Sequence, residues 1–137
     1  MKTPAPTLVA AAALLALLLG PCAAGARGGL QDEEDPCAPE AQRSPQLIAC
    51  ARRELRAADA ELKRAREELN ADLEPRSRVK LRASERLWLR YRKTNCDAEA
   101  SIYANGTIQP LIELRCMARL TRGRAAELRA QLQTLRG

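Results

Sequence analysis

Apolar side chains recur every three or four residues along most of the chain after residue 44, the spacing that places them on one face of an α-helix. The first series follows Ser44 and Pro45, an N-cap residue and a proline at the first helical position. It stops at Pro75, whose ring ends a helix. A helix is therefore predicted over about residues 45–73, with an apolar stripe made of Leu47, Ala51, Leu55, Ala58, Leu62, Ala65, Leu69 and Leu73.

Two more helices follow from the same spacing. One, over about residues 77–103, is expected to bury Leu81, Ser84, Leu87, Trp88, Tyr91, Asn95, Ala98 and Ile102. After a turn at Asn105-Gly106, the other covers about residues 108–135, with a stripe made of Leu111, Leu114, Ala118, Thr121, Ala125, Leu128, Leu132 and Leu135. Short connections make successive helices antiparallel neighbours. The predicted fold class is all-α, a small three-helix antiparallel domain over residues 44–137.

The first 26 residues have the pattern of a secretory signal peptide. Lys2 precedes an apolar run from Leu8 to Leu19, and the segment ends in Ala24-Gly25-Ala26, a small-x-small cleavage site. The run is too short to cross roughly 30 Å of hydrocarbon as a helix. We therefore expect an exported protein, periplasmic or secreted, with no transmembrane span.

Cysteine parity bears on a possible lipid anchor at Cys22. The preceding Leu19-Gly20-Pro21 has the outline of a bacterial lipobox, although proline fits poorly directly before the cysteine. Cleavage after Ala26 removes Cys22 and leaves an even set of four cysteines, as expected in an oxidising compartment. A free, exported form is favoured over a lipid-anchored one.

The remaining cysteines are expected to staple the domain, because stripes rich in alanine give a thin core. Cys37 lies just before the first helix and Cys50 in its first turns. Cys96 and Cys116 stand ten residues either side of Gly106, so antiparallel helices bring them to matching heights. Of three possible connectivities, we predict Cys37–Cys50 and Cys96–Cys116.

Charge divides the exported chain into two parts. Residues 27–43 form an acidic leader with two basic and five acidic side chains, whereas residues 44–137 carry 20 basic and 12 acidic ones. The chain contains no histidine, which excludes Ser-His-Asp and Cys-His catalytic units and the usual catalytic zinc sites. Aromatic residues are 2% of the chain, too few for a base-stacking nucleic-acid surface. We expect no enzyme activity, no cofactor, no metal and no nucleic-acid partner.

Three groups of residues are candidate partner-binding sites. The acidic leader concentrates negative charge. It either attracts a basic partner or is an ordinary solvated segment. A row of arginines spaced by four suits an anionic partner, or is an ordinary solvated face. A Trp and an Arg share one helix face and form either a partner anchor or a core plug beside the disulfide. The candidates are Asp32, Glu33, Glu34 and Asp35; Arg78, Arg82, Arg86 and Arg90; and Trp88 with Arg92.

Several unlike residues also match one family pattern in their spacing. The first helix has Cys50 followed by Ala58-Asp59-Ala60-Glu61-Leu62, and the second has Trp88-Leu89-Arg90-Tyr91-Arg92 and then Cys96. Gly106-Thr107, Pro110, Cys116, Leu120-Thr121, Arg124 and Glu127-Leu128 complete the series. Over residues 37–135 the chain resembles the LprI-type lysozyme inhibitors, small exported four-cysteine helical domains of bacteria. It departs from that pattern at Lys63, Arg66 and Lys93.

The resemblance implies a non-enzymatic protein that binds lysozyme or a related partner in the bacterial envelope. It supplies no inhibitory motif that can be assigned to particular residues. Common host lysozymes are strongly basic, so an inhibitor gains encounter rate from acidic surface, and here only the leader concentrates it. The alternative function is a structural or adhesion module that binds anionic envelope material through its arginine-rich helix face.

Overall fold

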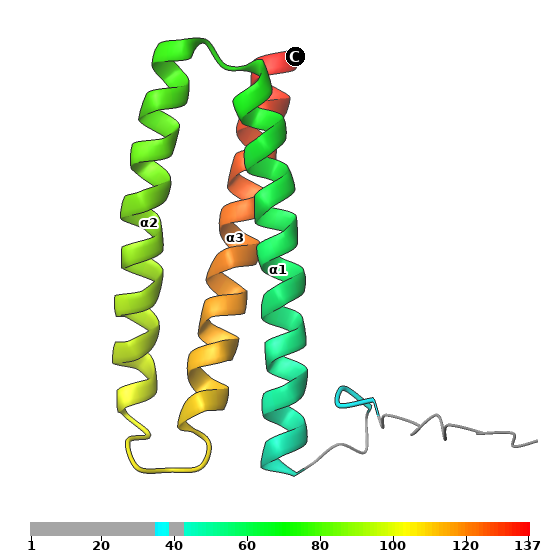
Figure 1. The fold of residues 1–137 in the computed structure, drawn as a ribbon, viewed down its shortest axis with the longest axis vertical. Coiled ribbons are helices and arrows are strands. Elements are labelled where there is room, and N and C mark those ends of the chain that lie inside the picture. The colour runs from blue at the N-terminus through cyan, green and yellow to red at the C-terminus, as the bar shows by residue number, and fades with distance from the viewer. Residues whose placement is uncertain (1–34, 39–42) are drawn as a thin grey trace, which may run out of the picture. The chain divides into compact units, whose positions relative to one another are not determined.

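A computed structural model describes residues 35–38 and 43–137. It contains three helices in this part of the chain, α1 (Ser44–Asp72), α2 (Pro75–Ser101) and α3 (Gln109–Arg136), and no strand (Figure 1). The predicted all-α fold with three helices is therefore confirmed. Each predicted helix end lies within two residues of the observed one.

A proline stands in the first turn of every helix, and these prolines decide where the helices begin. Pro75 is the first residue of α2, so it starts the second helix two residues earlier than expected. The predicted N-cap role of Ser44 is wrong: Ser44 is already helical, Arg43 occupies the N-cap position, and no side chain caps the helix. Proline has a preset φ angle and no N–H to satisfy, which lets a helix begin without a side-chain cap.

The third helix is the shared packing partner of the other two. α1 contacts α3 along much of its length and runs parallel to it, while α2 runs antiparallel to both (Figure 1). Direct contacts between α1 and α2 are few. The expectation that successive helices pack as neighbours therefore holds for α2 and α3, whereas α1 packs mainly on α3.

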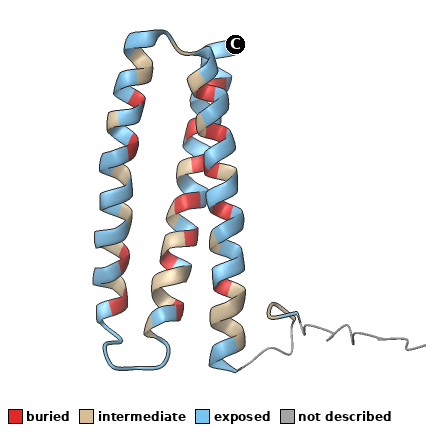
Figure 2. Ribbon diagram, in the orientation of Figure 1, coloured by how far each residue is buried: buried red, intermediate tan, exposed pale blue. Residues whose placement is uncertain are grey.

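Apolar stripes of α1 and α3 form the core, as their spacing predicts. Buried positions line the facing sides of the helices (Figure 2). Leu135 is the exception, with 51% of its surface exposed near the end of α3. Leu73 and Trp88 pack against the edge of the central cluster, which consists of Leu62, Ala65, Leu69, Leu81, Ala125, Leu128 and Leu132.

The expected inner face of α2 is wrong for several positions. Leu87, Tyr91 and Ile102 are exposed, by 58%, 55% and 78% of their surface. The buried residues of α2 are instead Leu81, Glu85, Cys96 and Ala100. A charged residue occupies a core position here because a partner on α3 satisfies it, as described below. The predicted stripe did not include Glu85, and its face is therefore rotated relative to the observed one.

Two disulfides join the predicted pairs of cysteines. Cys37 and Cys50 have a Cα–Cα distance of 4.9 Å, and Cys96 and Cys116 one of 5.5 Å. The first ties residues 35–38 to α1, and the second clamps the end of the α2–α3 hairpin near its turn. Both sulfurs of the second bridge lie in the core, since Cys96 and Cys116 are almost fully buried.

Candidate functional site

Arg92 of α2 connects all three helices. Its Nη1 atom donates a hydrogen bond of 2.7 Å to Asp59 Oδ1 on α1 and one of 2.6 Å to Thr121 Oγ1 on α3. The guanidinium carbon lies 5.2 Å from the centre of the Trp88 ring, close enough for a cation–π interaction. Thr121 in turn donates to the Met117 carbonyl oxygen, so the hydroxyl that accepts from Arg92 is itself held by the backbone of α3.

Glu85 and Arg124 form a second polar link, between α2 and α3. Arg124 donates to Glu85 Oε1 from Nε at 3.0 Å and from Nη2 at 2.7 Å, and a further bond joins it to Glu127. Desolvation lowers the pKa of Arg124, but the hydrogen bonds and charges of the two carboxylates outweigh it, so the pKa is raised overall. The guanidinium thus stays charged inside the fold. No buried side-chain nitrogen or oxygen among the described residues lacks a hydrogen-bond partner.

Trp88 and Arg92, a predicted partner-binding pair, therefore lie at the junction of the helices. Trp88 is half-buried against the core, and the Arg92 side chain is 16% exposed. Every polar contact of Arg92 described above is made within the chain. These contacts match the core-plug interpretation of the pair, since Trp88 is only partly exposed.

The arginine row on α2 divides into one structural residue and three free ones. Arg78 donates from Nε to the Leu73 carbonyl oxygen at 2.6 Å and from Nη2 to the Ala71 carbonyl oxygen at 3.3 Å, satisfying carbonyls at the end of α1. Arg82, Arg86 and Arg90 are exposed and make no ion pair with any described residue. Their charges are therefore available to solvent or to an anionic partner.

A groove of about 370 Å³ is lined by residues of α1 and α2. Leu81 and Leu89 supply apolar lining. Three arginines and two carboxylates also line the groove: Arg66, Arg82, Arg86, Glu67 and Glu85. Arg66 is one of the positions at which the sequence departs from the LprI pattern. The structure thus brings Arg82 and Arg86 of the predicted row together with Arg66 of α1, which the row did not include.

Only Asp35 of the predicted acidic site falls within the described residues, and Asp32, Glu33 and Glu34 lie outside them. The Asp35 carboxylate accepts a hydrogen bond of 2.9 Å from the Cys37 backbone N–H and pairs with Arg53 at 2.7 Å. The backbone bond first, and Arg53 second, lower the pKa of Asp35. Asp35 is therefore engaged in fixing the start of the domain.

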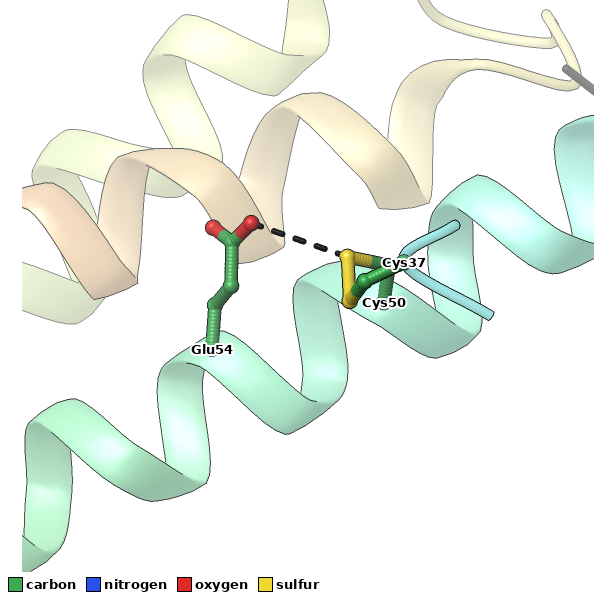
Figure 3. Close-up of side chains that lie close together, drawn as sticks. All are labelled: Cys37, Cys50 and Glu54. Carbon is green, nitrogen blue, oxygen red and sulfur yellow. Dashed lines mark hydrogen bonds between the residues drawn. A yellow bond between two sulfur atoms is a disulfide. The ribbon is translucent and has the colours of Figure 1, made fainter. Parts of the chain in front are cut away.

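Glu54 stands beside the Cys37–Cys50 bridge (Figure 3). One of its carboxylate oxygens lies 3.6 Å from Cys50 Sγ. Three such groups at this separation would suit a metal ion only if the cysteines were thiolates, and here both sulfurs are already bonded to each other. The oxidised protein uses this cluster as a staple.

The connection between α2 and α3, residues 102–108 and hereafter the α2–α3 tip, carries exposed apolar side chains. Ile102, Tyr103 and Ile108 expose 78%, 44% and 41% of their surface. Sequence reasoning missed this surface because it placed Ile102 inside and treated Asn105-Gly106 only as a turn. A signal was present: residues 100–112 contain no charged side chain, in a chain that is 29% charged.

Comparison with known proteins identifies relatives over nearly the same stretch. A family model described as "Lysozyme inhibitor LprI" matches residues 37–128. A protein of Rhizobium meliloti (strain 1021), described as uncharacterized, is 30% identical over 138 residues, covering 91% of this chain and 96% of its own. No solved structure matches significantly. None of the helices in the described residues is long and apolar enough to cross a membrane.

Proposed function

The chain belongs to the LprI family of lysozyme inhibitors, and from this premise we propose that it is an exported, non-enzymatic protein that inhibits lysozyme by binding it. The family match carries the proposal, since it extends over both disulfides and most of the three helices. The fold supports a binding role. Two disulfides and satisfied buried polar links hold the surface in one shape, which lowers the entropy lost on association.

A titration tests this function directly. Increasing amounts of the oxidised protein, added to a c-type or g-type lysozyme acting on bacterial cell walls, should lower hydrolysis to a saturable limit. The protein alone should release no cell-wall fragments. Protein with both disulfides reduced serves as the control and should inhibit less. Unchanged hydrolysis at a large molar excess, with both lysozyme types, would contradict the proposed function.

Export is part of the same proposal. Residues 1–26 would act as a signal peptide and be removed, leaving Arg27 as the first residue of an acidic leader that precedes the domain at 44–137. The protein would then be periplasmic or secreted. N-terminal sequencing of the protein from its native envelope checks this, and an acylated Cys22 would instead place it on a lipid anchor.

The acidic leader is a candidate for attracting a basic lysozyme. Asp32, Glu33 and Glu34 are the appropriate residues to neutralise, because Asp35 already pairs with Arg53. Replacing them by Asn, Gln and Gln should slow association most at low salt, where unlike charges attract over longer distances. An association rate equal to that of the unaltered protein at every salt concentration would exclude the leader from this role.

Adhesion to anionic envelope polymer is a second candidate function. The observation that favours it is the absence of ion pairs at Arg82, Arg86 and Arg90 among the described residues. The triple variant R82Q/R86Q/R90Q should lose co-sedimentation with isolated envelope material. Arg78 stays unchanged because it caps α1. The matched control, R52Q/R56Q/R64Q, removes three exposed arginines from α1 and should still co-sediment; equal losses would indicate unspecific attraction by net charge.

A further inference from the structure

The α2–α3 tip is held in shape without the help of its side chains. Its backbone closes successive turns through hydrogen bonds from Tyr103 N–H to Ala100 O, from Ala104 N–H to Ser101 O and from Gly106 N–H to Tyr103 O, each 3.0–3.1 Å long. Asn105 adopts a left-handed conformation with φ of 66°, which asparagine tolerates better than most residues. The Cys96–Cys116 bridge fixes the two helices just behind.

The turns of the tip close through backbone hydrogen bonds, so its exposed apolar side chains are not needed to hold them. Ile102 and Ile108 are the first and last residues of the tip, and Tyr103 follows Ile102 in the sequence. The whole connection between α2 and α3 is exposed (Figure 2). Large apolar side chains exposed within one short segment often mark a protein interaction surface. A rigid surface of this kind loses little entropy when it binds.

Charge distinguishes the tip from the rest of the molecule. No charged residue occurs between Glu99 and Glu113, and the structure pairs both of these carboxylates with cations. Glu99 accepts from Arg119 at 2.9 Å, and Glu113 lies 3.8 Å from Lys93. This end of a strongly basic domain is thus close to neutral, so it can approach a basic protein with little repulsion.

We infer that the α2–α3 tip enters the substrate cleft of lysozyme and blocks it; this inference rests on the proposed function. Glycosidases of this kind hold two carboxylates in a concave cleft that binds sugar rings. Burying a charged side chain there would cost desolvation energy, and an acidic one would also meet like charge. A rigid, convex and uncharged tip avoids both costs. Its isoleucines and tyrosine supply apolar area, while Asn105 and Thr107 offer hydrogen-bonding groups to a cleft built for sugars.

A pair of charge variants separates entry into the cleft from general electrostatics. In I102E/I108E the tip gains two negative charges, which should speed encounter with a basic enzyme but prevent burial in its cleft. We expect the inhibition constant against a c-type lysozyme to rise by about tenfold or more, the usual scale for disabling an interface centre. The matched control V79E/L87E makes the same charge change at two exposed apolar positions of α2, 57% and 58% exposed, and should inhibit like the unaltered protein.

Competition supplies an independent measurement. A chitin trisaccharide that occupies the cleft should displace the inhibitor, and the inhibition should be competitive with soluble substrate. Equal inhibition constants for both double variants, or binding unaffected by saturating trisaccharide, would overturn entry into the cleft while leaving the proposed function intact. Failure of the unaltered protein to inhibit at all would refute the proposed function itself, and is measured first. Circular dichroism and thermal unfolding verify that each variant retains the fold.

Discussion

At the scale of residues, hydrogen bonds of charged side chains attach α2 to the other two helices. Glu85 bonds to Arg124 of α3, and Arg92 bonds to Thr121 of α3 and to Asp59 of α1. α2 contributes Leu81 as the only leucine that it buries. Hydrogen bonds to charged groups are directional, so they fix the rotation of α2 more closely than apolar contact alone would.

The buried pair gives a first prediction. Glu85→Ala leaves the Arg124 guanidinium, only 12% exposed, without its main partner, and should lower the free energy of unfolding by about 3 kcal/mol. The double variant Glu85→Leu/Arg124→Leu removes both charges and should lose less than Glu85→Ala. Urea denaturation measures both. Arg122→Ala, at an exposed neighbour, is the control and should change stability little. A double variant that loses as much stability as Glu85→Ala, or more, would contradict the prediction.

A second prediction concerns pH and Asp35. Its pKa is lower in the folded protein than the ordinary value of 3.8, because the Cys37 N–H and Arg53 favour the carboxylate. The resulting stabilisation is present above that ordinary value and is lost as the pH falls through the folded pKa. Thermal unfolding should therefore show Asp35→Asn less stable than the unaltered protein at pH 7, with the difference shrinking as the pH falls below 3.8 and through the lowered pKa of Asp35.

Arg53→Gln removes only the ion pair and leaves the larger contribution of the Cys37 N–H, so it should show a smaller pH-dependent loss of stability than Asp35→Asn. A difference between the unaltered protein and Asp35→Asn that stayed constant from neutral to strongly acidic solution would contradict the assigned cause of the pKa shift.

At the scale of elements, the helices differ in what makes them stable. α1 buries a regular stripe against α3, whereas α2 buries little apolar surface and depends on its polar links and the disulfide. α3 contacts both partners, yet it contains a glycine, Gly123, near its middle. An added Cβ at this position would meet no atom within 4 Å. Glycine there weakens α3 without any packing that requires it.

Gly123→Ala should accordingly stabilise the protein by about 0.5–1 kcal/mol, the difference in helix propensity between the two residues. Thermal unfolding followed by circular dichroism measures the gain. Gly106→Ala is the contrasting variant: a Cβ there would lie 3.1 Å from the Tyr103 carbonyl oxygen, so no gain is expected. Equal stabilisation by both substitutions would contradict this reasoning. It would mean that the change in backbone entropy accounts for the whole gain and that the room around the added Cβ has no effect.

At the scale of the whole molecule, the two disulfides have different structural roles. Cys37–Cys50 fastens a short segment to the start of α1, and Cys96–Cys116 joins two long helices behind the α2–α3 tip. The second closes the longer loop, with a sequence separation of 20 against 13, and its sulfurs are buried. It therefore stabilises the hairpin and also holds the surface that we place in the lysozyme cleft.

Cys96→Ala/Cys116→Ala should lower the free energy of unfolding by about 3 kcal/mol or more, from loop entropy and lost packing. Hydrogen exchange of α2 amides should accelerate, and inhibition of lysozyme should weaken under conditions in which the variant is still folded. Cys37→Ala/Cys50→Ala serves as the comparison and should leave α2 exchange unchanged. Equal protection of α2 in both variants would contradict the separate role of the second disulfide.

Local patterns in the sequence were sufficient for the helices, their order and the disulfides. The stripes of α1 and α3 were predictable because apolar residues spaced by three and four leave a helix one face to bury. Cys96 and Cys116 were predictable because a short turn between antiparallel helices brings positions at equal distance from it together. The resemblance to LprI proteins likewise rests on residue spacing along the chain, and the family match confirms it.

Tertiary structure alone decided which face of α2 points inward, which arginines are free and where apolar surface is left exposed. Glu85 and Arg92 are held inward by their partners Arg124 and Thr121. Because these partners stand 39 and 29 residues away along the chain, no helical repeat in the sequence reveals the pairing. Arg78 is also held by a partner on another helix, because it donates to a carbonyl oxygen at the end of α1. It is therefore not one of the free arginines of the predicted row. A charge is stable in a core only when a partner arrives from elsewhere in the fold, and once Glu85 and Arg92 face those partners, Leu87 and Tyr91 of the same helix turn outward.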